Sequence, residues 1–161
     1  MNVEDLFGGQ AHGRRAQGPR KGQTIEATLR LDLESAYHGG TREITLQQPD
    51  GSTKRIDVRI PAGTTDGTTI RLAGQGGGGT QGGAAGDVLL RIQLAPHPRY
   101  RVEGHDLHMP LPVTPWEAAL GARVPVRTLD GEVTLTIPAG AQSGQKLRLR
   151  GKGMPRRGGE R

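Results

Sequence analysis

The sequence predicts an all-β protein of two tandem, homologous, small β-sandwich-like domains. The main observation is an internal repeat, because IPAGTTDGTTIRLAGQG at residues 60–76 recurs as IPAGAQSGQKLRLRGKG at residues 137–153, with more than half of the positions identical. Stretches that alternate polar and apolar residues supply the strands, and 27 glycines and 11 prolines supply the turns. Two copies of one turn-rich ending therefore indicate two copies of one structural unit.

The first copy has the pattern of short strands joined by tight turns. From residue 24 onward apolar and polar residues alternate, which is the period of a half-buried strand. A glycine pair at 39–40 ends a short helical turn, and PDGS at 49–52 is typical of a hairpin turn. The predicted elements are a strand at 24–33, a helical turn at 33–40, strands at 42–47, 54–60, 69–72 and 87–94, and a flexible loop at 76–86.

The second copy repeats these signals over a shorter stretch. Ala118 and Gly121 correspond to Ala36 and Gly39, so the helical turn recurs at 116–121. A counterpart of the strand 87–94 is absent, so we expect the natural second domain to continue past Arg161, with an unpaired sheet edge in this copy. The remaining predicted elements are strands at 107–113 and 146–149 and a hairpin turn at 130–131. The predicted boundaries are a Gly/Arg-rich linker at 1–22, a first domain at 23–97 and a second, incomplete domain at 98–161.

Composition and charge exclude several classes of protein and leave one alternative open. With no cysteine, the chain has no disulfide, no thiolate zinc site and no cysteine nucleophile. No signal peptide or membrane-spanning run is present, which predicts a cytoplasmic protein without a membrane partner. The net charge of +6 is compatible with a nucleic-acid partner, but no aromatic residues alternate with the cations to stack on bases.

Candidate catalytic, metal and phosphate-binding groups are weak. Asp32, Ser35 and His38 are close along the chain, yet a short helical turn explains them better than a catalytic triad. The glycine run 74–79 is not followed by Lys-Ser or Lys-Thr, so it does not have the sequence of a phosphate-binding loop. The sequence therefore predicts a protein that is not an enzyme and has no cofactor.

The histidines and the single tryptophan have structural explanations. His97, His105 and His108 lie in Pro-rich surroundings that favour loop histidines over metal ligands. Trp116 opens the second helical turn, and we expect it to anchor that turn to the sheet. A carbohydrate-binding β-sandwich is disfavoured, because sugar stacking needs exposed aromatic residues and only 2% of the chain is aromatic.

Five further motifs occur along the chain: DLFGG at 5–9, LDLESAYHGGTREI at 31–44, APHPRYRVEGHDLHMPLPV at 95–113, EAALGARVPVRTLDG at 117–131 and LRLRGKGMP at 147–155. Together they resemble the C-terminal half of DnaJ-type J-domain co-chaperones. Because no cysteine is present and the first copy is uninterrupted, the resemblance is to the class without the zinc domain, which includes the curved-DNA-binding protein A type. In that family a J-domain precedes this region, so the chain by itself is not expected to stimulate an ATPase.

The resemblance implies a site for unfolded polypeptide on the first domain. It implies an apolar groove bordered by alternate strand residues, at which a client peptide could add as a strand. Carried over by position, the groove residues are Ala27, Leu29, Ile44, Leu46, Ile56, Val58 and Leu90. The acidic C-terminal tail of a DnaK-type chaperone is the second implied ligand, with Arg42, Lys54 and Arg55 as its candidate contacts.

The predicted function is therefore to hold non-native polypeptide for delivery to a DnaK-type chaperone. The alternative is a DNA-binding module of the nucleoid type, with weak contact to DNA. Salt distinguishes the two functions, because the affinity for DNA phosphates falls steeply as the salt concentration rises and the affinity for a peptide changes little. The extreme C-terminal segment through which relatives dimerise is not present, so we expect a monomer for this chain and a homodimer for the full-length protein.

Overall fold

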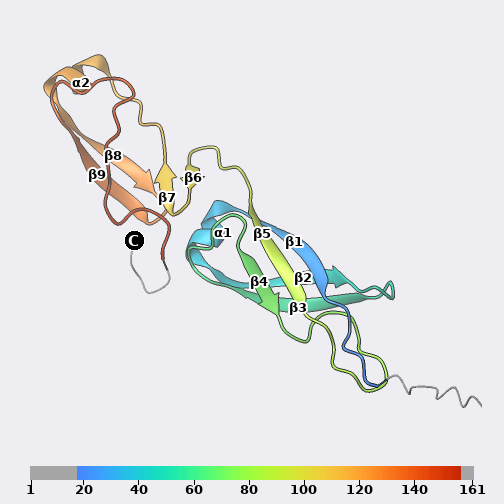
Figure 1. Cartoon of the computed structure of the whole chain (residues 1–161). Helices are drawn as coiled ribbons and strands as arrows, with labels where there is room; N and C mark the ends of the chain where they lie inside the picture. The colour runs from blue at the N-terminus through green and yellow to red at the C-terminus, as the bar shows by residue number, and fades with distance from the viewer. Residues whose placement is uncertain (1–17, 157–161) are drawn as a thin grey trace, which may run out of the picture.

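The computed structural model describes residues 18–156 and arranges them as two modules placed end to end (Figure 1). The first module contains α1 and β1 to β5, the second contains α2, β8 and β9, and the hairpin β6–β7 lies between them. Strands dominate both modules and each helix is six residues long, which confirms the predicted all-β class with one short helical element in each copy. The motif at 5–9 and most of the predicted linker lie outside the described residues.

The first module is a sandwich of a three-stranded sheet and a hairpin. In the sheet, β5 (Val88–Leu94) is the central strand; it runs parallel to β1 (Ile25–Leu31) and antiparallel to β4 (Thr69–Leu72). The opposite layer is β2 (Gly40–Gln47) paired antiparallel with β3 (Thr53–Ile60). The predicted hairpin turn at 49–52 is confirmed, and Asp50 stabilises it by accepting hydrogen bonds from the backbone and hydroxyl of Ser52.

Helix α1 (Leu33–His38) joins the two layers. Asp32 is its N-cap and accepts a hydrogen bond from the backbone N–H of Ser35 at 3.0 Å. The helix ends at Gly39, whose φ of 69° is in the left-handed region that favours glycine. The helix buries its inner face in the sandwich, with Leu33, Ala36 and Tyr37 as the buried residues.

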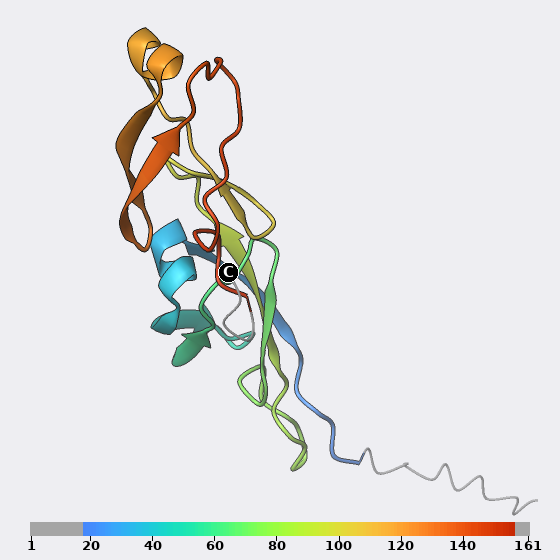
Figure 2. The same ribbon diagram turned by 90° about the vertical axis from the view of Figure 1, so that its left-hand side faces the viewer.

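The glycine-rich loop at 74–86 is held by backbone hydrogen bonds, unlike the free loop that the composition predicts. It projects beyond the sheet beside residues 20–24 (Figures 1 and 2). Arg20 and Thr80 exchange two backbone hydrogen bonds of 3.1 Å, and Gly22 N–H donates to the Ala84 carbonyl at 2.8 Å. A Cβ on Gly22 would overlap the backbone of Gly77, so the two segments can approach this closely only through glycine.

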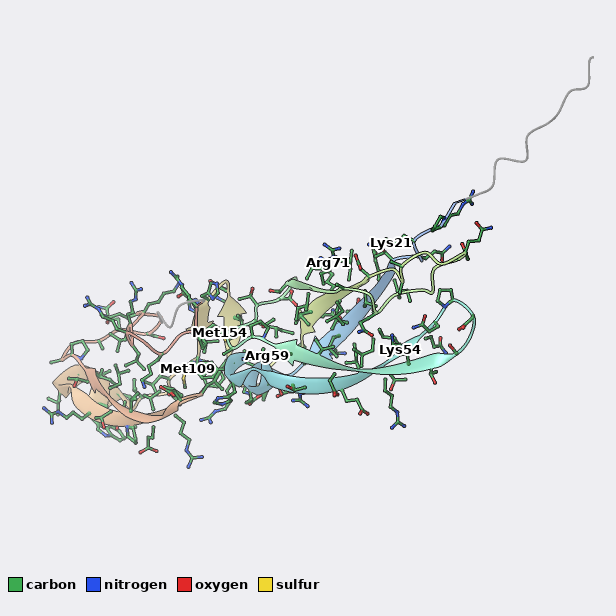
Figure 3. All side chains as sticks on the ribbon, turned by 90° about the horizontal axis from the view of Figure 1, so that it is seen from below. Lys21, Lys54, Arg59, Arg71, Met109 and Met154 are labelled. Atoms are coloured by element: carbon green, nitrogen blue, oxygen red, sulfur yellow. The ribbon has the colours of Figure 1, made fainter. Side chains whose placement is uncertain are left out.

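Asp87 fastens the base of this loop to the sheet. Its carboxylate accepts from Arg71 Nη2 at 2.6 Å, from Lys21 Nζ at 3.2 Å and from the backbone N–H of Gly74 at 3.1 Å. The Lys21 and Arg71 side chains extend toward the same part of the molecule (Figure 3). These donors, the Gly74 N–H first among them, lower the pKa of Asp87 from 3.8 to about 2.

The second module repeats the first at the level of single hydrogen bonds. Helix α2 (Pro115–Leu120) has Thr114 as its N-cap, in the position that Asp32 has before α1, and Thr114 and Glu117 form a capping box. Gly140 N–H donates to the Ala118 carbonyl at 2.8 Å, as Gly63 N–H donates to that of Ala36 at 2.8 Å. The hairpin of β8 (Ala122–Thr128) and β9 (Gly131–Ile137) is the counterpart of β2–β3 and confirms the turn predicted at 130–131.

Two predicted strands of the second module are wrong. Residues 146–149 are coil, and in the predicted strand 107–113 only the start is extended, as part of β7 (Asp106–His108), which pairs with β6 (Arg101–Glu103). The physical reason is the missing partner, because the corresponding strands β1 and β4 are both held by β5 and the described residues contain no counterpart of β5 here. Alternating polar and apolar residues do not form a β-strand unless a neighbouring strand takes up their backbone hydrogen bonds.

The position of Trp116 also differs from the prediction. Its side chain is 66% exposed instead of anchored on a sheet, and α2 buries none of its residues. In the repeat Trp116 corresponds to Glu34, an outward-facing residue of α1, which explains its exposure. The described helices are both too short to cross a membrane.

The junction between the modules is packed and hydrogen-bonded. Tyr100 donates its hydroxyl to the Arg127 carbonyl at 2.6 Å, and His97 Nε2 lies 2.8 Å from Glu34 Oε1. Met154, which is wholly buried, belongs to the same core cluster as the first module and lies near the junction in Figure 3. The returning segment is held by Met154 N–H, which donates to the His105 carbonyl at 2.7 Å.

Candidate functional site

Strand β1 forms one edge of the three-stranded sheet. It pairs with β5 in a parallel register that places Ile25 beside Val88, Ala27 beside Leu90 and Leu29 beside Ile92. Its other side faces no strand anywhere in residues 18–156. The outer backbone N–H and C=O groups of β1 are therefore available to a further strand.

The apolar side chains on this edge are only partly covered. Paired residues of neighbouring strands point to the same face of a sheet, yet Val88, Leu90 and Ile92 are at most 1% exposed whereas their partners on β1 are half-buried. The hairpin β2–β3 thus covers the centre of the sheet more completely than its edge. We call the half-buried residues Ile25, Ala27 and Leu29 the edge row.

Strand β2 is also an edge strand of the first module, as are β3 and β4. It pairs with β3 and, among the described residues, with nothing else. Its inward side chains Ile44 and Leu46 are buried at 9% and 6% exposure. The edge row packs against the core cluster to which both residues belong, so an apolar surface continues from β1 into the interior.

The predicted groove residues fall into two groups. Ala27 and Leu29 are half-buried on the edge of β1, where a ligand can contact them. The other five lie in the core, which differs from the expectation of a lined groove, because the two layers of the sandwich press these side chains together. They are Ile44, Leu46 and Ile56 at 6–9% exposure, and Val58 and Leu90 at 0% and 1%.

The three candidate cations do not form a single cluster. Arg42 donates to Ser35 Oγ and lies 3.6 Å from Asp32 Oδ1, so it already has partners beside α1. Lys54 pairs with Leu46 at the far end of the hairpin, on the inward face. Arg55 is next to it in sequence and therefore points to the outer face.

The residues considered for catalysis have structural roles. The Ser35 hydroxyl donates to Asp32 at 2.7 Å within the cap of α1, and these hydrogen bonds lower the pKa of Asp32. His38 is exposed in the last turn of that helix, with its ring against Tyr37. The three residues thus form a helix cap rather than a catalytic triad.

The candidate metal ligands are also separate from one another. His97 contacts Glu34, and His108 lies 3.3 Å from Glu103. Within residues 18–156 no group of three or more His, Cys, Asp or Glu side chains could hold a metal ion.

Ile25 is the site residue that the sequence reasoning left out. It lies on the same face of β1 as Ala27 and Leu29, so the alternation of polar and apolar residues predicts it equally well. The difference in burial between β1 and β5 has no such signal, since both strands alternate in the same way. The two strands differ in burial because β5 is the central strand of the sheet and β1 lies at its edge.

The DnaJ C-terminal domain matches residues 25–161, which include every strand and helix of both modules. The chain belongs to the DnaJ C-terminal domain family. This is a co-chaperone family and not an enzyme family, and the resemblance seen in the sequence is confirmed.

Similar proteins are known as curved DNA-binding proteins. The protein of that name from Coxiella burnetii (strain RSA 493 / Nine Mile phase I) is 47% identical over 164 residues, which cover 94% of this chain and 52% of the relative. Those from Pseudomonas putida (strain KT2440) and Serratia proteamaculans (strain 568) are 49% and 50% identical, over 96% and 91% of this chain and 51% and 50% of theirs. This DnaJ C-terminal domain chain therefore spans about half the length of these relatives.

Proposed function

We propose that this chain binds non-native polypeptide as an extended strand along the open edge of β1. The observation that supports the proposal is the edge row, an apolar strip of three half-buried residues beside unpaired backbone groups. A strand added at such an edge gains main-chain hydrogen bonds that do not depend on its sequence. That property suits a protein that must bind many unfolded clients.

Side-chain contacts would favour apolar clients over polar ones. Alternate side chains of the added strand would cover Ala27 and Leu29, whose remaining exposed surface is removed from water on binding. Ile44, Leu46 and Ile56 would be reached only by side chains that enter between β1 and β2, and Val58 and Leu90, at 0% and 1% exposure, would not be reached. The site would therefore be shallow and its preference broad.

In the longer proteins of the family we propose delivery of the bound client to a DnaK-type chaperone. The acidic C-terminal tail of that chaperone would use Lys54 and Arg55 at the end of the β2–β3 hairpin. Arg42 would have to exchange its contact with Asp32 for the tail. We expect its contribution to be smaller for that reason.

A titration monitored by backbone amide chemical shifts tests the proposed site. An extended apolar peptide should shift the resonances of β1 and β2 in a saturable way and leave the outer positions of β3 unchanged. A set of shifts confined to the second module would place the client site elsewhere and overturn the proposal.

DNA binding is the second candidate, and two observations favour it. The similar proteins carry the name curved DNA-binding protein, and the chain has a net charge of +6. Exposed cations are concentrated near the end of the second module, where Lys146, Arg148 and Arg150 alternate with leucines. Such cations would contact phosphates without reading sequence.

A further inference from the structure

The outward face of β1 carries two opposite charges, one near each end of the strand. Glu26 and Arg30 lie on the face opposite the edge row, and both side chains are exposed. Because a strand rises ≈ 3.3 Å per residue, the two residues are about 13 Å apart along β1. We call Glu26 and Arg30 the β1 charge pair.

Neither member of the β1 charge pair has an ionic partner in the described part of the chain. Within residues 18–156 neither side chain forms an ion pair. Their register partners on β5, Leu89 and Gln93, are uncharged. The other side of β1 faces no strand in the same residues, so a charged side chain of an added strand can approach both positions from there.

The central strand makes the two ends of β1 unequal. Arg91 of β5 is exposed on the same outward face, opposite Thr28 and therefore diagonal to both members of the β1 charge pair. Diagonal neighbours in a sheet are about 7–8 Å apart, so Arg91 adds positive charge beside Arg30 and offsets part of the negative charge of Glu26. An acidic side chain near Arg30 is therefore the more favourable of the two contacts.

The other edge strands of the first module lack this arrangement. On the outward face of β3, Asp57 lies between Arg55 and Arg59, so both ends of that face have the same sign. The outward face of β2 has a single charge, Glu43, which is opposite Asp57. Arg71 of β4 is already paired with Asp87. Strand β1 is thus the edge strand whose outward charges distinguish one end from the other.

We propose that the β1 charge pair determines the direction in which an extended client lies along β1. The inference rests on the proposed client site and adds a preference to it. An acidic side chain of the client lies beside Arg30 and a basic one beside Glu26, while the apolar side chains between them cover the edge row. The preferred segment therefore has opposite charges four residues apart, and it lies antiparallel to β1 when the acidic residue comes first and parallel when the basic residue does.

Two peptides of the same composition test the direction of binding to the 161-residue chain. One has glutamate first and lysine four residues later, the other has the reverse order, and both have alternate apolar residues and a nitroxide spin label at the N-terminus. The label on the glutamate-first peptide should broaden the amide resonance of Leu31 more than that of Ile25, and the label on the lysine-first peptide should do the reverse. Glu26→Arg combined with Arg30→Glu should exchange the two results.

Affinities test whether the charges themselves are responsible. Arg30→Glu gives both ends of β1 the same sign and should weaken each charged peptide about three- to tenfold, since opposite charges across a sheet attract and like charges repel. A peptide with glutamine at both charged positions should stay within about twofold. The loss should nearly disappear at about 1 M salt, where the Debye length is only ~3 Å.

Arg59→Glu is the matched control, because it makes the same change of charge on the exposed outward face of β3. It should leave all three affinities within about twofold. If the glutamine peptide binds β1 but both charged peptides lie in the same direction, or Arg30→Glu and Arg59→Glu cause equal losses, the inference is overturned and the proposed client site is retained. If none of the three peptides binds, or all of them bind only the second module, both the inference and the proposed function are overturned.

Discussion

Gly63 and Pro155 lie in contact across the junction, and a Cβ on Gly63 would overlap the carbonyl oxygen of Pro155. The turn that closes β3 of the first module thus packs directly on the segment that follows the second copy of the repeat. Met154, next to Pro155, is wholly buried in the core of the first module. A side chain at residue 63 therefore decides whether this segment can dock.

The first prediction compares Gly63→Ala with Gly140→Ala. Both glycines have nearly the same φ, 78° and 79°, so alanine costs roughly 1–2 kcal/mol of left-handed backbone strain at either position. A Cβ on Gly140 meets nothing within 4 Å. Gly63→Ala should lower the free energy of unfolding by a further ~1–3 kcal/mol, the usual cost of forcing a backbone shift.

Thermal or urea unfolding of the two variants measures this difference. Hydrogen exchange should show that the Met154 amide loses protection in the Gly63→Ala variant and keeps it in Gly140→Ala. Equal destabilisation of the two variants would show that the contact with Pro155 contributes nothing to stability.

The second prediction concerns acid stability. Folding lowers the pKa of Asp87 from 3.8 to about 2, so the folded state binds this proton less readily than the unfolded state. The stability that Asp87 contributes is therefore complete above about pH 4 and is lost as the pH falls toward 2. Asp87→Asn should be less stable than the natural chain at pH 7, and the gap between them should narrow steadily between pH 4 and pH 2.

Urea midpoints measured across that pH range test the prediction. Asp57→Asn, at an exposed outward position of β3, is the control and should follow the natural chain. A constant gap between Asp87→Asn and the natural chain at every pH would mean that the hydrogen bonds from Gly74 and Arg71 do not depend on the charge of Asp87.

The sequence predicted the elements of the first module well, because each element is specified by residues within its own segment. Alternation, the N-cap Asp32 and the PDGS turn each specify their own segment, and the structure has β1, α1 and the β2–β3 hairpin where these signals occur. The repeat also predicted matched turns, and the positive φ values of Gly63 and Gly140 confirm them. Gly76, which is identical in the two copies of the repeat, does not have a positive φ. Glycine is needed there for another reason, because a Cβ would clash with the backbone of Asp87.

The candidate site was harder to predict because it depends on strand order. Residues 146–149 have the same alternation as β4, yet they are coil, since a strand needs a partner and sequence periodicity does not supply one. In the same way Leu29 and Leu90 look equivalent in the sequence, but Leu90 lies on a central strand and Leu29 on an edge. Exposure at a sheet edge is a property of the whole fold and not of any one segment.

The third prediction tests the edge row. Leu29→Asp should weaken the binding of an extended apolar peptide by ~1–2 kcal/mol, about 5- to 30-fold, since it replaces half-buried apolar surface with a charge. It should also reduce the ability of the chain to suppress aggregation of an unfolded client. Thr28→Asp, on the opposite and exposed face of β1, should leave both activities unchanged.

Light scattering of an aggregating client and fluorescence titration of the peptide provide the two measurements. Circular dichroism is needed for each variant, because loss of the fold would also abolish binding. If folded Leu29→Asp and Thr28→Asp suppress aggregation equally well, the client does not use this edge.

The fourth prediction separates peptide binding from DNA binding by salt. A peptide held by backbone hydrogen bonds and apolar contacts at the edge row displaces few ions, so its affinity should change little between 50 and 200 mM salt. A DNA complex with six or more phosphate contacts should lose about a thousandfold in affinity over the same range. Lys146→Ala combined with Arg150→Ala should weaken only the DNA complex, because both cations lie on the second module. A peptide affinity that falls as steeply as that for DNA would mean that charge, and not the apolar edge, holds the client.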